Sequence, residues 1–337
     1  MQISPVVSDL ATQKSLLQRG SAVRAQMQTA SQEMSSGLKS DLVAATGGDL
    51  GGLFAIERGI VQLDSQIEGL NFAAAKASSA ENYLGQLAAG VAPFGVDLQA
   101  ALDRGDALAQ TSIAKGARAA FDAAVSALNG RYGRHALFAG AALDGPALVD
   151  SDAIYADLAA LASGAANGLD AIAAIDSYFN APGGGFETGA YLGGDTTAPG
   201  VEIAEGQRLN YALRADDAAF RQNLQALALV ALAAEGDTPG TPADARLMLR
   251  EGAALALENP GQILALREGL GHAAQRIDET IANASGALHG LELRRAAIVS
   301  ADPYETASAF QALQGQMEII YEVTARMANL RLVDRLR

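Results

Sequence analysis

The sequence predicts a mainly α-helical protein in which both chain ends form a long antiparallel helical rod or coiled coil, with a small α+β domain inserted between them. Three observations predict this fold class. Apolar residues recur every 3.5 residues over two long segments, one early and one late in the chain. The segment between them is acidic and mixes helix and strand patterns. Both ends carry apolar stripes at helical spacing.

The two heptad repeats predict a pair of long helices that pack on each other. One runs from Ile56 to Val91 and the other from Leu270 to Ile298. A lone surface helix follows a 3.6-residue period, whereas a sustained 3.5-residue period requires a helical partner. The core positions of the two repeats are Ile56, Ile60, Leu63, Ile67, Leu70, Ile277, Ile281, Leu288 and Leu291.

Glu81 and Arg295 are the charged positions on these two seams. Charged seam residues either set the register of a helix pair or turn their charged ends outward, and both alternatives stay open.

The remaining elements are predicted from residues that start or stop helices and from short alternating patterns. A third helix is predicted at 96–128, because Asn129-Gly130 is a usual helix stop, and extended chain follows it. Glycines 183–185 lack a phosphate-loop context and are interpreted as a linker. The middle segment then predicts helices at 151–161 and 218–234, strands at 201–203 and 209–213, and a helix opened by Thr241-Pro242.

Negative charge is concentrated in the middle of the chain. Residues 141–260 hold 17 acidic and 5 basic residues, in a chain whose net charge is −14. This balance argues against nucleic acid and anionic membrane as partners. It also predicts that the acidic middle, 141–259, is an inserted outer domain. Together with the helix patterns of the flanks this gives two further domains, a terminal coiled coil (1–45 with 300–337) and a long-helix bundle (46–140 with 260–299).

The chemistry-bearing residues form no catalytic pattern. The chain has no cysteine, which excludes disulfides, thiolate metal sites and cysteine nucleophiles. His135, His272 and His289 lack metal-ligand spacing, and no phosphate loop or nucleophile elbow occurs. We therefore expect a protein that is not an enzyme and has no catalytic residue, metal or cofactor.

The sequence predicts neither a cleaved signal nor a membrane span. Residues 1–5 show no basic region followed by an apolar one. The longest wholly apolar run, 226–234, has nine residues, whereas a span needs about 20. We expect a soluble protein that leaves the cytoplasm, if it does so, without a cleaved signal.

Apolar stripes at both ends predict an assembly interface. Neither end has enough neighbours in its own sequence to bury its stripe, and isolated helices of this kind are marginal in water. We expect these helices to pair with each other and to contact other subunits. The predicted interface residues are Val23, Met27, Met34, Leu38, Phe310, Leu313, Met317, Ile320, Val323, Met327, Leu330 and Leu332.

Three segments carry a family resemblance. The segment QMQTASQEMSSGLK, which begins at Gln26, resembles the start of the bacterial flagellin superfamily. Within that superfamily, Asn129-Gly130-Arg131-Tyr132 followed by Leu137-Phe138-Ala139-Gly140, and the ending at 327–336, are similar to the hook-associated protein 3 family. The family's S-D-D-P-type turn is replaced here by Ala45-Thr46-Gly47-Gly48-Asp49, which leaves the contacts of that turn in doubt.

The resemblance implies a structural component of the bacterial flagellum that joins the hook to the flagellin filament. Implied partners are further copies of the chain, the preceding hook-associated protein, flagellin and an export chaperone. The implied location is extracellular, after flagellar type III export. It also implies that the paired termini line an inner tube, with the long helices in the next shell and the insert outermost.

Three alternatives remain open. A flagellin filament subunit is the nearest, and copy number along the filament would discriminate it. A coiled-coil sensor or adaptor with a ligand-binding insert is the second, but it predicts a membrane span or a basic membrane patch. An enzyme acting from the insert is the least favoured.

Overall fold

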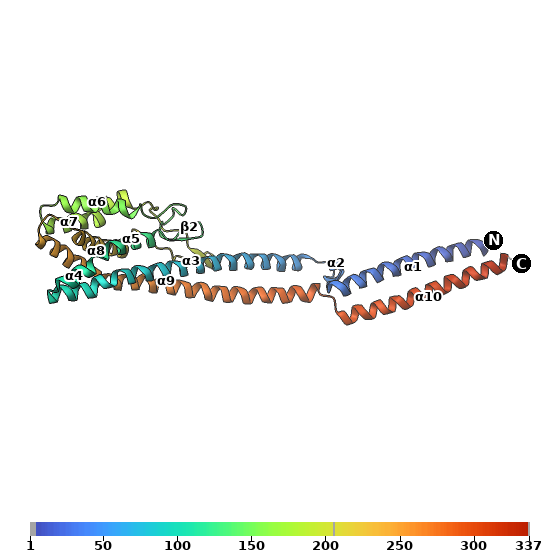
Figure 1. Ribbon diagram of the computed structural model, residues 1–337. Coiled ribbons are helices and arrows are strands. Elements are labelled where there is room, and N and C mark those ends of the chain that lie inside the picture. The colour runs from blue at the N-terminus through green and yellow to red at the C-terminus, as the bar shows by residue number, and fades with distance from the viewer. Residues whose placement is uncertain (1–4, 205, 336–337) are drawn as a thin grey trace. The chain divides into compact units, whose positions relative to one another are not determined.

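The computed structural model describes residues 5–204 and 206–335, and the side chains of residues 11, 14–203 and 206–327. Within them the fold is mainly α, as the sequence predicts, with long helices and two small antiparallel sheets (Figure 1). The elements are α1 (Pro5–Ser36), α2 (Leu42–Ala45), α3 (Gly51–Arg104), α4 (Ala107–Ala114), α5 (Ala117–Leu128), β1 (Arg131–Tyr132), β2 (His135–Ala136), α6 (Ser151–Gly164), α7 (Gly168–Asn180), the π-helix η1 (Phe186–Ala190), β3 (Val201–Ala204), β4 (Gln207–Leu209), α8 (Ala218–Glu235), α9 (Pro242–Val299) and α10 (Pro303–Arg335).

The chain divides into two compact units. The terminal unit combines residues 1–64 with residues 285–337, and the central unit is the continuous segment 65–284. The long helices α3 and α9 contribute to both units. The predicted division into three domains, with breaks near residues 45, 140 and 259, stays a prediction.

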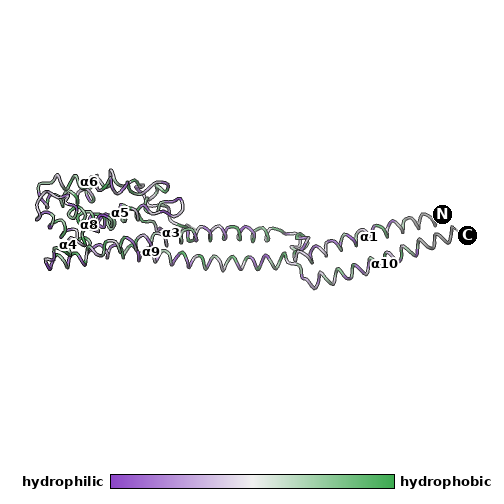
Figure 2. The backbone as a smooth tube through the Cα atoms, in the orientation of Figure 1, coloured by the Kyte–Doolittle hydropathy of each residue, from purple (hydrophilic) through white to green (hydrophobic). Residues whose placement is uncertain are grey.

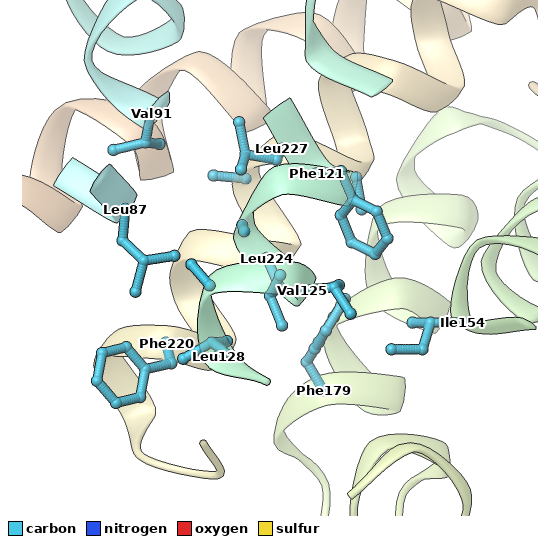
Figure 3. Packing of buried hydrophobic residues seen from close by; sticks show 14 of the residues in the cluster. Leu87, Val91, Phe121, Val125, Leu128, Ile154, Phe179, Phe220, Leu224 and Leu227 are labelled. Carbon is cyan, nitrogen blue, oxygen red and sulfur yellow. The ribbon is translucent and has the colours of Figure 1, made fainter. Parts of the chain in front are cut away.

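The central unit is built around one large hydrophobic core (Figure 3). Helix α8 lies within it, and residues 223–232 are all buried, as expected for a helix that is apolar on every side. The core is continuous across residues 140 and 259, so the acidic segment shares it with the long helices. Figure 3 labels members from five helices: Leu87 and Val91 of α3, Phe121, Val125 and Leu128 of α5, Ile154 of α6, Phe179 of α7, and Phe220, Leu224 and Leu227 of α8.

The predicted single helix at 96–128 is wrong, because three helices occupy it. Helix α3 ends at Arg104, and Gly105 follows it with φ +69°. Asp106 then caps α4, since its Oδ1 accepts a hydrogen bond from the N–H of Ala109 at 3.1 Å. A left-handed glycine next to an N-capping aspartate is a helix stop followed by a helix start. The predicted end at Leu128 is confirmed.

The acidic segment agrees with the sequence at its helix starts. Asp150 caps α6 and Asp217 caps α8, each through a side-chain oxygen that accepts a backbone N–H. Thr241 caps α9, with Pro242 in the first helical position.

Two features of this segment differ from the prediction. Helix α7, which Asn167 caps by accepting the N–H groups of Leu169 and Asp170, was not expected. The second strand, β4, covers residues 207–209 rather than 209–213. It pairs antiparallel with β3, and the pairing has a register shift between Glu202 and Ala204.

The supposed glycine linker is a packed bend. A Cβ on Gly184 would stand 2.6 Å from the carbonyl oxygen of Ser177, and a Cβ on Gly185 would overlap the Tyr178 ring. These glycines therefore permit close approach to α7, and their role is not that of a free spacer.

The heptad seam holds α3 beside α9 within each unit. In the central unit, Leu70 and Ile277 are fully buried, and β3 and β4 pack against them through Val201 and Leu209. Arg267 donates two hydrogen bonds to Glu81 Oε1, at 2.8 and 2.6 Å.

In the terminal unit, Arg295 Nε donates to Glu57 Oε1 at 3.5 Å. The two charged seam positions, Glu81 and Arg295, are therefore interhelical contacts. The other core heptad residues are half-buried, because a two-helix seam covers them from one side: Ile56, Ile60, Leu63, Ile67, Ile281, Leu288 and Leu291.

Candidate assembly surface

Helices α1 and α10 form an antiparallel pair in the terminal unit (Figure 1). The Cγ2 of Ile320 lies 3.6 Å from where a Cβ on Gly20 would stand. One turn along, Arg24 Nη2 donates a hydrogen bond to the hydroxyl of Tyr321 at 2.9 Å. Leu38, near the end of α1, forms an antiparallel bridge with Ser300, just before α10. Residue numbers thus rise along one helix as they fall along the other.

Short backbone contacts fix the register of this pair. The N–H of Lys39 donates to the carbonyl of Val299 at 2.8 Å, and the N–H of Ala301 donates to that of Gly37 at 2.9 Å. Gly37 has φ +70°, a left-handed conformation that ends α1 at low steric cost. The segment that follows α1 and the segment that precedes α10 are therefore joined by main-chain hydrogen bonds.

Helix α10 starts at a strong cap. Asp302 Oδ1 accepts the N–H of Tyr304 at 2.8 Å and that of Glu305 at 3.2 Å, and Pro303 occupies the first helical position. Proline is favoured there because that N–H has no helical acceptor.

The turn between α2 and α3 is held by hydrogen bonds of its own residues. Asp41 Oδ1 accepts the N–H of Ala44 at 2.9 Å and so caps α2. Gly47 and Gly48 have φ +65° and +95°, and Asp49 Oδ1 accepts the N–H of Gly51 at 2.8 Å. Glycines therefore supply the left-handed backbone of the turn that leads into α3.

The predicted interface residues fall into three groups by exposure. Val23 and Met317 are buried in the α1–α10 seam, and Met27, Phe310, Leu313, Ile320 and Met327 are half-buried. Met34, Leu38 and Val323 are exposed. Leu330 and Leu332 lie outside the residues whose side chains the structure describes.

Further apolar side chains of the terminal unit face outward, and the heptad pattern did not single them out. The exposed fractions are 65% for Leu17, 62% for Ile319 and 56% for Tyr321. Apolar and polar residues alternate along both helices, so one seam cannot bury all of the apolar ones (Figure 2). The terminal unit also exposes Val43, Phe54, Val61, Leu293 and Tyr304.

The central unit carries an open groove of about 750 Å³ on α6 and α7. Its lining includes Asp157, Leu161, Tyr178 and the glycine bend that follows Pro182. Burial, and next the carboxylate of Asp157, raise the pKa of Tyr178 to about 12. The groove presents a neutral phenol at neutral pH.

The described residues hold neither a cluster of metal-binding side chains nor a membrane-spanning helix. No group of three or more His, Cys, Asp or Glu side chains there is placed to hold a metal ion. None of the described helices combines the length and apolar character needed to cross a membrane.

Similarity to known proteins is found among solved structures. None of the protein-family models and none of the curated proteins matches the chain. Among solved structures, the chain is similar to a protein from Vibrio parahaemolyticus whose assignment as a flagellar hook-associated protein is itself provisional. The two chains are 16% identical over 82% of this chain and 95% of the other, with a TM-score of 0.36. At that identity and TM-score, the similarity decides nothing about the function of this chain.

Proposed function

We propose that this chain is a structural, non-enzymatic subunit of the bacterial flagellum that joins the hook, through the preceding hook-associated protein, to the flagellin filament. The observation that carries the proposal is the α1–α10 pair with Leu17, Ile319 and Tyr321 exposed on it. Ile319 and Tyr321 lie on the two flanks of Ile320, which packs on α1, so exposed apolar side chains border the helix seam. Such apolar borders favour a protein-binding surface. Sister subunits, the preceding hook-associated protein and flagellin would cover these side chains after assembly.

The sequence motifs favour a role at the hook–filament junction over a role as the filament subunit. The segments at 129–140 and 327–336 are similar to the junction family. The proposal includes an extracellular location, export without a cleaved signal, and an export chaperone that covers the terminal helices before assembly.

Deleting the gene tests the junction role. We expect cells whose hooks carry no filament and whose flagellin is shed into the medium, because the first flagellin ring would have no subunit to bind. Electron microscopy of the hooks and assay of secreted flagellin measure both outcomes, and restoring the gene should restore filaments. Filaments of normal length on the deletion strain would refute the proposal. If immunogold labelling found the protein along the whole filament, it would be the flagellin.

A matched pair of substitutions tests the surface itself. We expect Ile319→Asp to abolish assembly while leaving the helix content of the monomer unchanged, because a carboxylate would be buried unpaired between subunits. Gln314→Asp, at an exposed polar position of the same helix, is the control and should assemble normally. Ile320→Asp should instead reduce helix content, because Ile320 faces α1. Normal filaments from Ile319→Asp would contradict the assigned face.

A further inference from the structure

A small basic and aromatic surface stands on the central unit of this acidic chain. It combines one face of α3, at Phe72 and Lys76, with the hairpin of β1 and β2, at Arg131, Tyr132 and Arg134. These five residues are called the hairpin face below. They come from segments more than 50 residues apart in the sequence, so only the fold brings them together.

The turn of the hairpin exposes its arginine. Gly133 has φ +59°, and no residue other than glycine has positive φ among the described ones, so Arg134 follows with negative φ. That order fits a type II′ turn, which matches the twist of a two-residue hairpin. Arg134 therefore lies at the tip of the hairpin, and its side chain is exposed.

Aromatic contacts attach the hairpin to α3. The Phe72 ring meets the Tyr132 ring edge to face at 5.4 Å and the His135 ring at 5.8 Å. Lys76 Nζ lies 5.9 Å from the centre of the Phe72 ring. Phe72 nevertheless remains 44% exposed. The hairpin face thus offers an open aromatic ring between cationic groups, a composition enriched in protein interfaces.

Among the described side chains, no carboxylate forms an ion pair with the cations of this surface, which are Lys76, Arg131 and Arg134. Arg131 instead donates to the main-chain carbonyls of Arg134 and Asp144 and so braces the hairpin. Burial lowers the pKa of the Lys76 ammonium, the shift expected of a half-buried cation that lacks a carboxylate partner.

We propose that the hairpin face binds an acidic protein surface, and that residues 141–259 of a second copy of the chain supply it. Charge complementarity carries the choice of partner, because the chain itself presents 17 acidic and 5 basic residues between positions 141 and 260. In taking the partner to be a second copy, this inference rests on the proposed self-assembly. Subunits would then be joined by charged groups of the central unit as well as by apolar side chains of the terminal helices.

Zero-length cross-linking of the full chain tests the contact. A carbodiimide joins an amine to a carboxylate only when the two groups touch, and the chain has four lysines: Lys14, Lys39, Lys76 and Lys115. Mixing ¹⁴N- and ¹⁵N-labelled protein separates links between copies from links within one. We expect Lys76 to form the intermolecular links to carboxylates of residues 141–259, although Lys115 is the more exposed amine. Links should fall steeply between about 20 mM and about 500 mM NaCl, as the screening length shortens from about 20 Å to about 4 Å.

Charge reversal supplies the matched comparison. Arg134→Glu should lower the yield of Lys76 links about fivefold, whereas Arg134→Lys should retain them. Arg276→Glu makes the same change in net charge at an exposed position of α9 and should leave the yield unchanged. Arg134 suits the test because it serves the hairpin through its main-chain carbonyl, whereas Arg131 braces the hairpin through its side chain.

The outcomes separate this inference from the proposed function. The inference is overturned if Lys76 forms no intermolecular link at low salt, if Lys115 links dominate, or if Arg276→Glu lowers the yield as much as Arg134→Glu. Binding of the hairpin face to phosphatidylglycerol vesicles in place of a second copy would also overturn it. Rings or filaments seen by electron microscopy without Lys76 links would leave the proposed function standing. Lys76 links in a protein that never assembles would instead refute the proposed function.

Discussion

The buried phenol of Tyr178 shows how one residue makes stability depend on pH. Its pKa is raised to about 12, first by burial and then by the carboxylate of Asp157. The folded state therefore favours the neutral phenol more than the unfolded state does. This contribution is fully present below the ordinary tyrosine pKa of 10.0 and is lost as pH rises toward 12.

Tyr178→Phe tests that dependence, since it keeps the ring and removes the ionisation. We expect the free energy of unfolding of the variant to exceed that of the unchanged protein by a growing margin between about pH 10 and about pH 12. Urea unfolding at pH 8 and pH 11 measures the margin. An equal difference at both pH values would show that burial of the phenol does not control the alkaline transition.

A buried amide pair holds α8 against α9. Asn223 Nδ2 donates to Asn259 Oδ1 at 3.0 Å, and Asn259 Nδ2 donates to the carbonyl of Ala219 at 2.7 Å. Both side chains are fully buried. Removing one partner of such a pair leaves the other unsatisfied, which is the expensive outcome for a buried polar group.

Asn259→Ala should therefore destabilise the central unit by about 1–3 kcal/mol. Asn82→Ala, at an exposed position on α3, is the matched control and should change stability by less than about 0.5 kcal/mol. Urea unfolding followed by circular dichroism measures both. Similar values for the two variants would mean that water replaces the lost hydrogen bonds at no cost.

Helices α3 and α9 approach each other closely at Gly95. Pro260 has no N–H, so the carbonyl of Ala256, four residues earlier, loses its helical donor. Gly95 packs on this carbonyl, and a Cβ there would stand 2.8 Å from its oxygen and 2.9 Å from the N of Leu257. Because these atoms are backbone, they cannot move aside as a flexible side chain would.

Gly95→Ala should destabilise the protein by about 1–3 kcal/mol, the usual range for overpacking. Gly90→Ala, in the same helix, meets nothing within 4 Å and should stabilise it by about 0.5–1 kcal/mol. Opposite signs are the expected result, measured by thermal unfolding. A stabilising Gly95→Ala would show that α3 and α9 can separate there without loss.

Local chemistry made the helix starts predictable. Asp150, Asp217, Thr241 and Asp302 each accept backbone N–H groups of the first turn, as their positions before apolar runs indicate. The break at Gly105 was missed although its signal was present, because a helical pattern on both sides outweighed one glycine. Helix α7 was missed for a related reason, since Asn167 lies in a run of small residues whose periodicity is weak.

The sequence did not allow us to predict which apolar residues of the terminal helices are exposed. Ile319 and Ile320 are neighbours of the same type, yet the first is 62% exposed and the second lies against α1. Successive helix positions differ by about 100°, so a broad stripe fits either orientation. The hairpin face is a stronger case, because Phe72 meets Tyr132 only after α3 and the hairpin have folded together.

At the scale of the whole molecule, burial is distributed unevenly. The largest fully buried side chains, among them Phe121, Phe138, Phe179 and Phe220, all belong to the central unit. Among the described side chains of the terminal unit, the buried apolar ones are Val23, Ala30, Leu53, Val299 and Met317. Hydrophobic burial is the main favourable term in folding, so the two units should differ in stability.

The central unit should therefore fold without the terminal helices, and the terminal helices should open more readily than the central unit. Residues 65–284 form one continuous segment, so a fragment with these ends should fold alone and unfold cooperatively in urea, close to the main transition of the full chain. In the full chain, amides of α1 and α10 should exchange with solvent faster than those of α8 by about two orders of magnitude or more, because local opening there exposes little buried surface. Hydrogen exchange read by mass spectrometry measures the second effect, and circular dichroism of the fragment measures the first. A fragment without a cooperative transition, or terminal helices as slow as α8 in the dilute monomer, would mean that the terminal helices complete the fold on their own and have no need of sister subunits.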